Sequence, residues 1–167
     1  MAYFPLQDYD QVIDPKVKAV YDEIIAELGF GIVPNLFKSM AINPDFLAAS
    51  WQKFRSTILQ GNVPRTIKEM IGIAISQANE SEYALNVHLH GLSALGISEV
   101  VLQTLVSDFA DCPLPEREKA VIRFGLLAPT PPPPLSPKDY QTLHELSLDH
   151  SELFELIPPS NFFTEVN

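Results

Sequence analysis

The stretch PRTIKEMIGIAISQA, residues 64–78, decides the fold class of this chain. Its centre, from Met70 to Ile75, puts apolar or small side chains on every side of a helix, as expected of a helix surrounded by other helices. Pro64 suits the first helical turn, where its missing N–H group costs nothing. We therefore predict a central buried helix that begins near Pro64.

Helical signals continue on both sides of this stretch. Asp14 is a good N-cap, Pro15 suits the first helical position and Gly29 suits the end of the same helix. Apolar residues at helical spacing predict further helices over residues 34–40, 43–61, 82–95, 98–106, 116–127 and 136–148. Apart from short ambiguous runs, no segment of strand length alternates with period two, so we expect an all-α fold of about eight helices.

The length of the chain, 167 residues, fits one domain, which we place over residues 1–167. Composition changes once, at a proline-rich connector over residues 129–137 that includes four consecutive prolines. Such a run cannot be helical and is expected to form an extended spacer. A C-terminal helix and an apolar tail follow over residues 138–167, and we expect the tail to dock on its own domain or on a neighbouring subunit.

The charge of the chain excludes whole classes of partner. The sequence has 21 acidic and 11 basic residues, a formal net charge of -10. This charge repels phosphate backbones and anionic membrane surfaces, so we expect neither nucleic acid nor a membrane as partner. No stretch approaches the roughly 18 apolar residues of a membrane span. Residues 1–11 lack the basic and apolar blocks of a secretory signal, so we expect a cytoplasmic protein.

Cys112 is the only cysteine. It lies in a turn-like stretch between Asp111 and Pro113, where no second sulfur is available within the monomer. We interpret it as a loop cysteine without a chemical role. The spacings of zinc sites, dinucleotide sites, phosphate loops and nucleophile elbows are all missing, so we expect no metal and no cofactor.

Glu69 is an acidic residue within the otherwise apolar central segment. On a helix it shares a face with Gly72, Ile73 and Ser76, small or apolar residues that allow a second helix to approach closely. A poorly solvated carboxyl group has a raised pKa, suited to a general acid or base, unless a cation or a donor compensates. The alternative is a capping box that starts at Thr66, in which Glu69 binds a backbone N–H group.

His88, on the next predicted helix, is the donor we expect for Glu69. The alternative is a hydrogen-bonded core histidine, and the sequence leaves both interpretations open. His90 lies two residues further on, so the two imidazoles point to roughly opposite faces of one helix. They cannot bind one metal ion together.

Three stretches resemble a known family, the alkylhydroperoxidase-D-like (AhpD-like), carboxymuconolactone decarboxylase superfamily, in its peroxidase-related branch. They are residues 28–37, the Lys68–Glu69 dipeptide at the head of an apolar helix, and residues 79–96, which contain His88 and end at a glycine. The resemblance covers about residues 15–161 and implies an AhpD-like helical domain with a central buried helix pair. It also implies a homo-oligomer: a dimer, a trimer or a hexamer.

The redox signature of that family is a glutamate, two cysteines separated by two residues, and a histidine. Aligned with this chain, it falls on Glu69, Ser81, Ala84 and His88. The glutamate and histidine are present at the family's spacing, while serine and alanine replace both cysteines. Because the thiolate is the reagent in dithiol peroxide chemistry, its loss removes the reaction itself. Ser81 cannot replace it, since seven helical residues separate it from His88 by about 10 Å of rise.

Three functions follow from these residues and this resemblance. The first is proton transfer by Glu69 and His88 on a small organic acid, a lactone or a related small molecule, as on the decarboxylase side of the superfamily. The second is a catalytically inactive, oligomeric binding or scaffold protein. The third is the peroxidase-related antioxidant activity of the family. For an anionic substrate, Arg65 and Lys68 are the cations nearest to the site in sequence.

Overall fold

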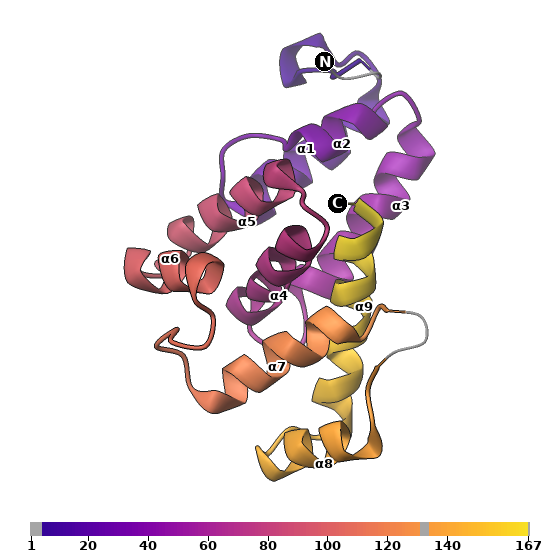
Figure 1. Ribbon diagram of the computed structural model, residues 1–167. Helices are drawn as coiled ribbons and strands as arrows, with labels where there is room; N and C mark the ends of the chain where they lie inside the picture. Colours follow the sequence, from indigo (N-terminus) through magenta and orange to yellow (C-terminus); the bar gives the residue numbers. More distant parts are fainter. Residues whose placement is uncertain (1–4, 131–133, 167) are drawn as a thin grey trace. The chain divides into compact units, whose positions relative to one another are not determined.

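The computed structural model describes residues 5–130 and 134–166, and Figure 1 gives the order of its helices. These residues form nine α-helices and no strand, which confirms the predicted all-α class. The chain divides into two compact units, Met1–Ser56 and Thr57–Asn167, and each is described by itself. The single domain expected over residues 1–167 stays a prediction.

The first unit contains a short 3₁₀ helix, η1 (Tyr9–Gln11), followed by α1 (Pro15–Leu28), α2 (Asn35–Met40) and α3 (Pro44–Phe54). Helix α1 begins and ends as predicted. The Asp14 side chain accepts hydrogen bonds from the backbone N–H groups of Lys16 and Val17, and Gly29 has the left-handed φ of 77° that ends the helix. Asn43 caps α3 in the same way by accepting from the N–H of Phe46.

Aromatic side chains form the core of the first unit. The rings of Phe37, Trp51 and Phe54 lie 5.7 Å apart by centroid, two of the three pairs edge to face and the third stacked. Such aromatic pairs add about 0.5–1.5 kcal/mol each to the stabilisation from burial alone. The indole N–H of Trp51 donates to Glu23 at 2.9 Å, which satisfies the one polar atom of this buried side chain.

The second unit is built around α4 (Arg65–Ala78), the helix predicted from the opening stretch. A short π-helix, η2 (Arg55–Leu59), precedes it. Around α4 lie α5 (Glu82–Ala94), α6 (Glu99–Ser107), α7 (Glu116–Leu127) and α9 (His150–Val166), as Figure 1 shows. Nearly every residue from Ile67 to Ser76 is buried, because α4 has neighbours on all sides.

The C-terminal part of the second unit differs from the predicted helix and tail. Helix α8 (Pro137–Glu145) begins as expected, with a capping box between Ser136 and Asp139. The residues expected to form a docking tail are instead α9, whose buried face packs on α4 and α7 of its own unit. Pro158 and Pro159 lie inside this helix, where neither can donate a backbone hydrogen bond. Part of the predicted proline spacer, residues 131–133, lies outside the described residues.

A search of residues 5–130 and 134–166 for a helix long and apolar enough to cross a bilayer finds none.

Candidate functional site

Glu69 lies inside α4 and not at its cap. The helix begins at Arg65, with Pro64 in the N-cap position, so Glu69 is in the second turn. A capping box from Thr66 is therefore wrong, because Thr66 is already helical. The carboxylate of Glu69 has a side-chain exposure of only 6% and is directed toward α5.

His88 meets this carboxylate from α5. Its Nδ1 atom lies 2.7 Å from Oε2 of Glu69, and both side chains are buried. The contact joins the two helices that form the densest packing of the unit, which matches the central helix pair that the resemblance implied. Both interpretations of His88 receive support, since it is a buried core histidine and also the partner of Glu69.

Arg65 approaches the same carboxylate from one helical turn earlier. Its Nε atom lies 3.3 Å from Oε1 of Glu69, an i,i+4 ion pair whose two side chains are 17% and 6% exposed. Arg65 therefore points inward, which the sequence could not establish. A second cation beside Glu69 favours the ionised carboxylate.

Two opposing effects act on the pKa of Glu69. Burial raises it, while the hydrogen bond and charge of His88 and then the guanidinium of Arg65 lower it. The partners outweigh burial, so the pKa lies below its ordinary value of 4.5. Both a donor and a cation that offset the burial of this carboxyl group are thus present, and Glu69 is ionised at neutral pH.

An ionised carboxylate fixes the proton position on His88. A carboxylate can only accept hydrogen bonds, so the proton shared with Glu69 resides on Nδ1. In the neutral imidazole, Nε2 then carries the lone pair and can accept a proton. The pair is therefore a base whose conjugate acid, the imidazolium, lies beside a negative charge.

Two neighbours hold the imidazole ring in place. A methyl group on Gly72 of α4 would lie 2.5–2.8 Å from three atoms of the ring, so only glycine lets α4 approach it this closely. Phe163 of α9 contacts the ring edge to face, with centroids 4.7 Å apart and an interplanar angle of 83°. The ring is thus confined by α4 on one side and by α9 on another.

Lys68 and Glu155 form a second ion pair, between a buried ammonium group and a half-buried carboxylate, and no local sequence signal indicates it. Lys68 is fully buried, and its Nζ lies 2.7 Å from Oε1 of Glu155 and donates to the carbonyl of Gln60 at 2.6 Å. Glu155 also accepts from the backbone N–H groups of Asn62 and Val63, at 2.8 and 3.0 Å. We call Lys68, Glu155 and the backbone of residues 60–63 the Lys68–Glu155 clamp.

The clamp fixes the backbone that leads into α4. Gly61 has a φ of 109°, and a methyl group there would lie 2.0 Å from a carboxylate oxygen of Glu155. Burial raises the pKa of Glu155, but Lys68 and the two backbone donors outweigh it, so this pKa is also lowered. Because Pro64 gives α4 no side-chain cap, Glu155 supplies hydrogen-bond acceptors just before the helix.

The positions of the missing cysteines lie at the start of α5. Ser81 occupies the N-cap position, but its side chain makes no cap hydrogen bond. Its backbone N–H donates to the carbonyl of Ser76 at 2.8 Å instead. Ala84 is buried one turn before His88, and an alanine methyl has no proton to exchange with the imidazole.

The other two candidate residues of the sequence lie elsewhere. Cys112 follows α6, is 1% exposed, and directs its Sγ toward the carbonyl of Val101 at 3.9 Å. His90 is exposed on α5 and lines a shallow pocket with residues of α6. The candidate site therefore consists of Glu69, His88 and Arg65, with Gly72 and Phe163 around the imidazole ring.

Comparison with known sequences supports the resemblance on which the site was aligned. The sequence model of the carboxymuconolactone decarboxylase family matches residues 44–123, a range that includes Glu69, Ser81, Ala84 and His88. No curated protein matches the chain.

Several solved structures share the fold. An AhpD-core, peroxidase-related protein from Ralstonia eutropha JMP134 matches with a TM-score of 0.83 at 21% identity, covering 96% of this chain and 83% of that one. A peroxidase-related protein from Silicibacter sp. TM1040 matches with a TM-score of 0.82 at 19% identity, covering 99% and 88%.

A third similar structure contains a ligand. It is a cysteine-to-alanine variant of the debrominase Bmp8 in complex with 2,3,4-tribromopyrrole, with a TM-score of 0.78 at 21% identity and coverages of 100% and 88%. At these identities the structural matches establish the fold alone. The sequence match and the fold together confirm the predicted resemblance: residues 44–123 match the sequence model of the carboxymuconolactone decarboxylase family, and the chain has the fold of the AhpD-core proteins.

Proposed function

We propose that this protein transfers protons on a small organic molecule, with His88 as the base and Glu69 as its orienting carboxylate. The observation that carries the proposal is the 2.7 Å contact between Nδ1 of His88 and Oε2 of Glu69. A buried carboxylate that stays ionised beside an imidazole is the arrangement that general acid–base catalysis requires.

The chemistry starts with Nε2 of His88. This atom takes a proton from an acidic C–H group of the substrate and becomes part of an imidazolium ion, while the electron pair stays on the substrate. Glu69 stabilises the imidazolium through Nδ1 and is itself not protonated. The same Nε2–H group then returns the proton to another atom of the substrate, so the enzyme ends in its starting state. General acid–base groups of this kind contribute about 10²–10⁴-fold to a rate.

The charge around the site supports a substrate with little net charge. Arg65 contacts Glu69, and Lys68 contacts Glu155, so a carboxylate already compensates each of the two nearest cations. A substrate with several carboxylates would need cations that are less engaged. Within the predicted range of organic acids, lactones and related molecules, we therefore favour a lactone or a small, weakly charged ring.

The ligand of a similar structure supports the same size class. The Bmp8 variant binds a small halogenated ring even though an alanine replaces one of its cysteines. In this chain, alanine also occupies one of the two positions aligned with the redox cysteines. A ring-binding site without a thiol at that position is consistent with proton transfer and leaves no thiol there for dithiol peroxide reduction.

The scaffold alternative rests on a different observation. Helix α6 exposes Val100 (61%), and helix α9 exposes Phe154 (71%). Exposed apolar side chains are what a subunit interface would cover. Sedimentation of the purified protein distinguishes a monomer from an oligomer. The scaffold function is favoured if an oligomer forms and if mutation of His88 changes no reaction of the protein.

The test of proton transfer has two stages. First, ¹⁵N NMR of the imidazole at neutral pH should show the tautomer with its proton on Nδ1 of His88. Second, lactones and small ring compounds incubated in D₂O should exchange an acidic C–H proton in the presence of the protein. His88→Gln should slow this exchange by about 100-fold or more, and Glu69→Gln should slow it less.

His90→Gln is the matched control, because His90 lies on the same helix but is exposed. It should leave the exchange rate unchanged. The proposal fails if the proton of His88 resides on Nε2, or if His88→Gln and His90→Gln exchange a substrate at the same rate.

A further inference from the structure

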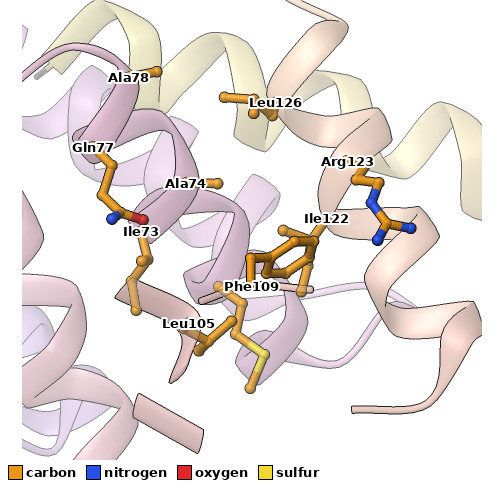
Figure 2. Close-up of a pocket in the computed structure, with 10 residues that line it drawn as sticks. Ile73, Ala74, Gln77, Ala78, Leu105, Phe109, Ile122, Arg123 and Leu126 are labelled. Carbon is orange, nitrogen blue, oxygen red and sulfur yellow. The ribbon is translucent and has the colours of Figure 1, made fainter. Parts of the chain in front are cut away.

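An apolar pocket lies on a face of α4 next to the one that carries Glu69. It has a volume of about 410 Å³ and is formed by α4, α6, α7 and the turn after α6 (Figure 2). Its lining includes Ile73, Ala74, Gln77, Phe109, Arg123 and Leu126. Glu69 and His88 are not among the lining residues, so the pocket is separate from the proton-transfer site.

The pocket has the composition of a small-molecule site. Eight of its lining side chains are apolar, and only Gln77 and Arg123 are polar. Gln77 already donates its side-chain N–H to the carbonyl of Val106 at 2.8 Å. Apolar walls with a few polar groups, and volumes of about 300–1,000 Å³, are typical of ligand pockets.

Arg123 differs from every other arginine of the chain. The sequence has four arginines, and the other three each contact a glutamate: Arg55 with Glu27, Arg65 with Glu69, and Arg117 with Glu152. Within residues 5–130 and 134–166, no carboxylate forms an ion pair with Arg123. Its guanidinium lies over the ring of Phe109, 5.3 Å from the centroid.

The charge around Arg123 makes this exception informative. The chain has 21 acidic residues, yet none of them lines the pocket. Figure 2 shows Arg123 and Phe109 near one another on one side of the pocket and Gln77 on the other. A guanidinium at the edge of an apolar pocket, without a carboxylate partner from the protein, favours an anionic group on the ligand.

We propose that this pocket binds a small apolar monocarboxylate. The carboxylate forms a bidentate ion pair with Arg123, and the apolar body lies against Ile73, Ala74 and Leu126. The body is an aromatic ring or a short alkyl chain, because both match the walls, and the ligands of the experiment distinguish the two. This binding site is independent of the function proposed for Glu69 and His88.

The experiment compares acids with their uncharged amides by isothermal titration calorimetry at low ionic strength. Benzoate and octanoate probe the aromatic and the alkyl body, and benzamide and octanamide are the controls without charge. At least one acid should bind, and its amide should bind about 10-fold more weakly or worse, since a hydrogen bond between two charged groups is stronger than one to a neutral amide. Whichever acid binds more tightly identifies the body.

Three variants locate the site. Arg123→Gln should weaken binding of the acid by about 10-fold or more, whereas Arg117→Gln, which removes the same charge from the same helix, should not. Ala74→Trp should abolish binding by filling the pocket. Ala78→Phe, at an exposed position of the lining, serves the same purpose if Ala74→Trp does not fold.

Several results would overturn the inference. Equal binding of acids and amides, or equal effects of Arg123→Gln and Arg117→Gln, would show that Arg123 does not select the anion. Unchanged binding in both pocket-filling variants would place the acid outside the pocket. Absence of binding, together with an oligomer that the filling variants dissociate, would show that a second copy of the chain covers this face.

Discussion

Lys68 and Glu69 are consecutive residues of one helix, both are buried and both are charged, but their surroundings differ. Lys68 contacts a carboxylate and a backbone carbonyl, and its partner Glu155 also binds two backbone N–H groups. Glu69 contacts an imidazole. An imidazole can both donate and accept a proton, which gives the second pair a chemical use, whereas the clamp consists of an ammonium group, a carboxylate and backbone groups. Burial of a charge alone does not identify an active site.

The comparison also predicts different responses to mutation. Removing one member of a buried ion pair leaves the other charge without compensation, and this costs more than the pair ever contributed to stability. The clamp should therefore dominate the stability of the second unit. The Glu69–His88 pair should dominate its pH dependence and its chemistry.

The largest effect is expected for Lys68→Met. The variant leaves Glu155 beside an uncharged side chain, and we expect the free energy of unfolding to fall by about 3–5 kcal/mol. Urea denaturation followed by circular dichroism measures this loss.

Lys119→Met is the matched control, because Lys119 is also buried but its ion-pair partner, Glu116, is 73% exposed. The carboxylate left behind there is mostly exposed, whereas Glu155 is 18% exposed, so the loss should be less than half as large. Equal losses in the two variants would mean that the clamp has no special role.

An intermediate effect is expected for Gly72→Ala. The new methyl group would meet the ring of His88 at 2.5–2.8 Å, a distance at which the ring must move. Overpacking of a core costs about 1–3 kcal/mol, and the better helix propensity of alanine returns up to about 1 kcal/mol. We therefore expect a net loss of about 1–2 kcal/mol, together with a shift of the His88 imidazole signals in the NMR spectrum.

Gly125→Ala separates the loss of stability from the movement of the His88 imidazole. Its methyl group would meet the side chain of Ile71 at 2.6–2.8 Å, so it should lower stability to a similar extent. It should leave the His88 signals in place. If both variants move those signals equally, then Gly72 is not what positions the imidazole.

The smallest effect is expected in the pH dependence of stability. The pKa of Glu69 is lowered in the folded protein, so the stabilisation from its ionised form is complete above the ordinary pKa of 4.5 and is lost as the pH falls through the lowered value. The effect is small because burial opposes His88 and Arg65. The difference in unfolding free energy between the wild type and Glu69→Gln should therefore shrink in acid.

Urea denaturation of both proteins between neutral pH and about pH 2.5 measures that difference. A difference that stays constant over the whole range would mean that Glu69 is not ionised in the native state at neutral pH.

Local signals in the sequence predict the helix starts well. Asp14, Asn43 and the Ser136–Asp139 capping box each act at the position that their residue types indicate. The same reasoning places Glu69 inside α4, once Pro64 is taken as the start. These predictions succeed because a cap depends on residues within one helical turn.

Features that depend on residues far apart in the chain could not be predicted. Glu155 binds backbone that precedes α4, and nothing around Glu155 in the sequence indicates this contact. The sequence predicts an apolar tail where α9 lies, and this helix forms although Pro158 and Pro159 interrupt its helical pattern, because tertiary packing overrides local preference. Ser81 has the residue type of a cap, but its hydroxyl makes no such bond.

The number of residues in helix α9 matters as well as the surface that the helix buries. It contacts the clamp at Glu155 and the imidazole of His88 at Phe163, and between these two points neither Pro158 nor Pro159 has an N–H group to donate to the preceding turn. Because the middle of the helix lacks these two backbone donors, its conformation depends on the contacts at Glu155 and Phe163. One residue inserted between them would rotate Phe163 by about 100° around the axis. Substitutions on the outer face of this segment should be tolerated, but its number of residues is fixed by the two sites it connects.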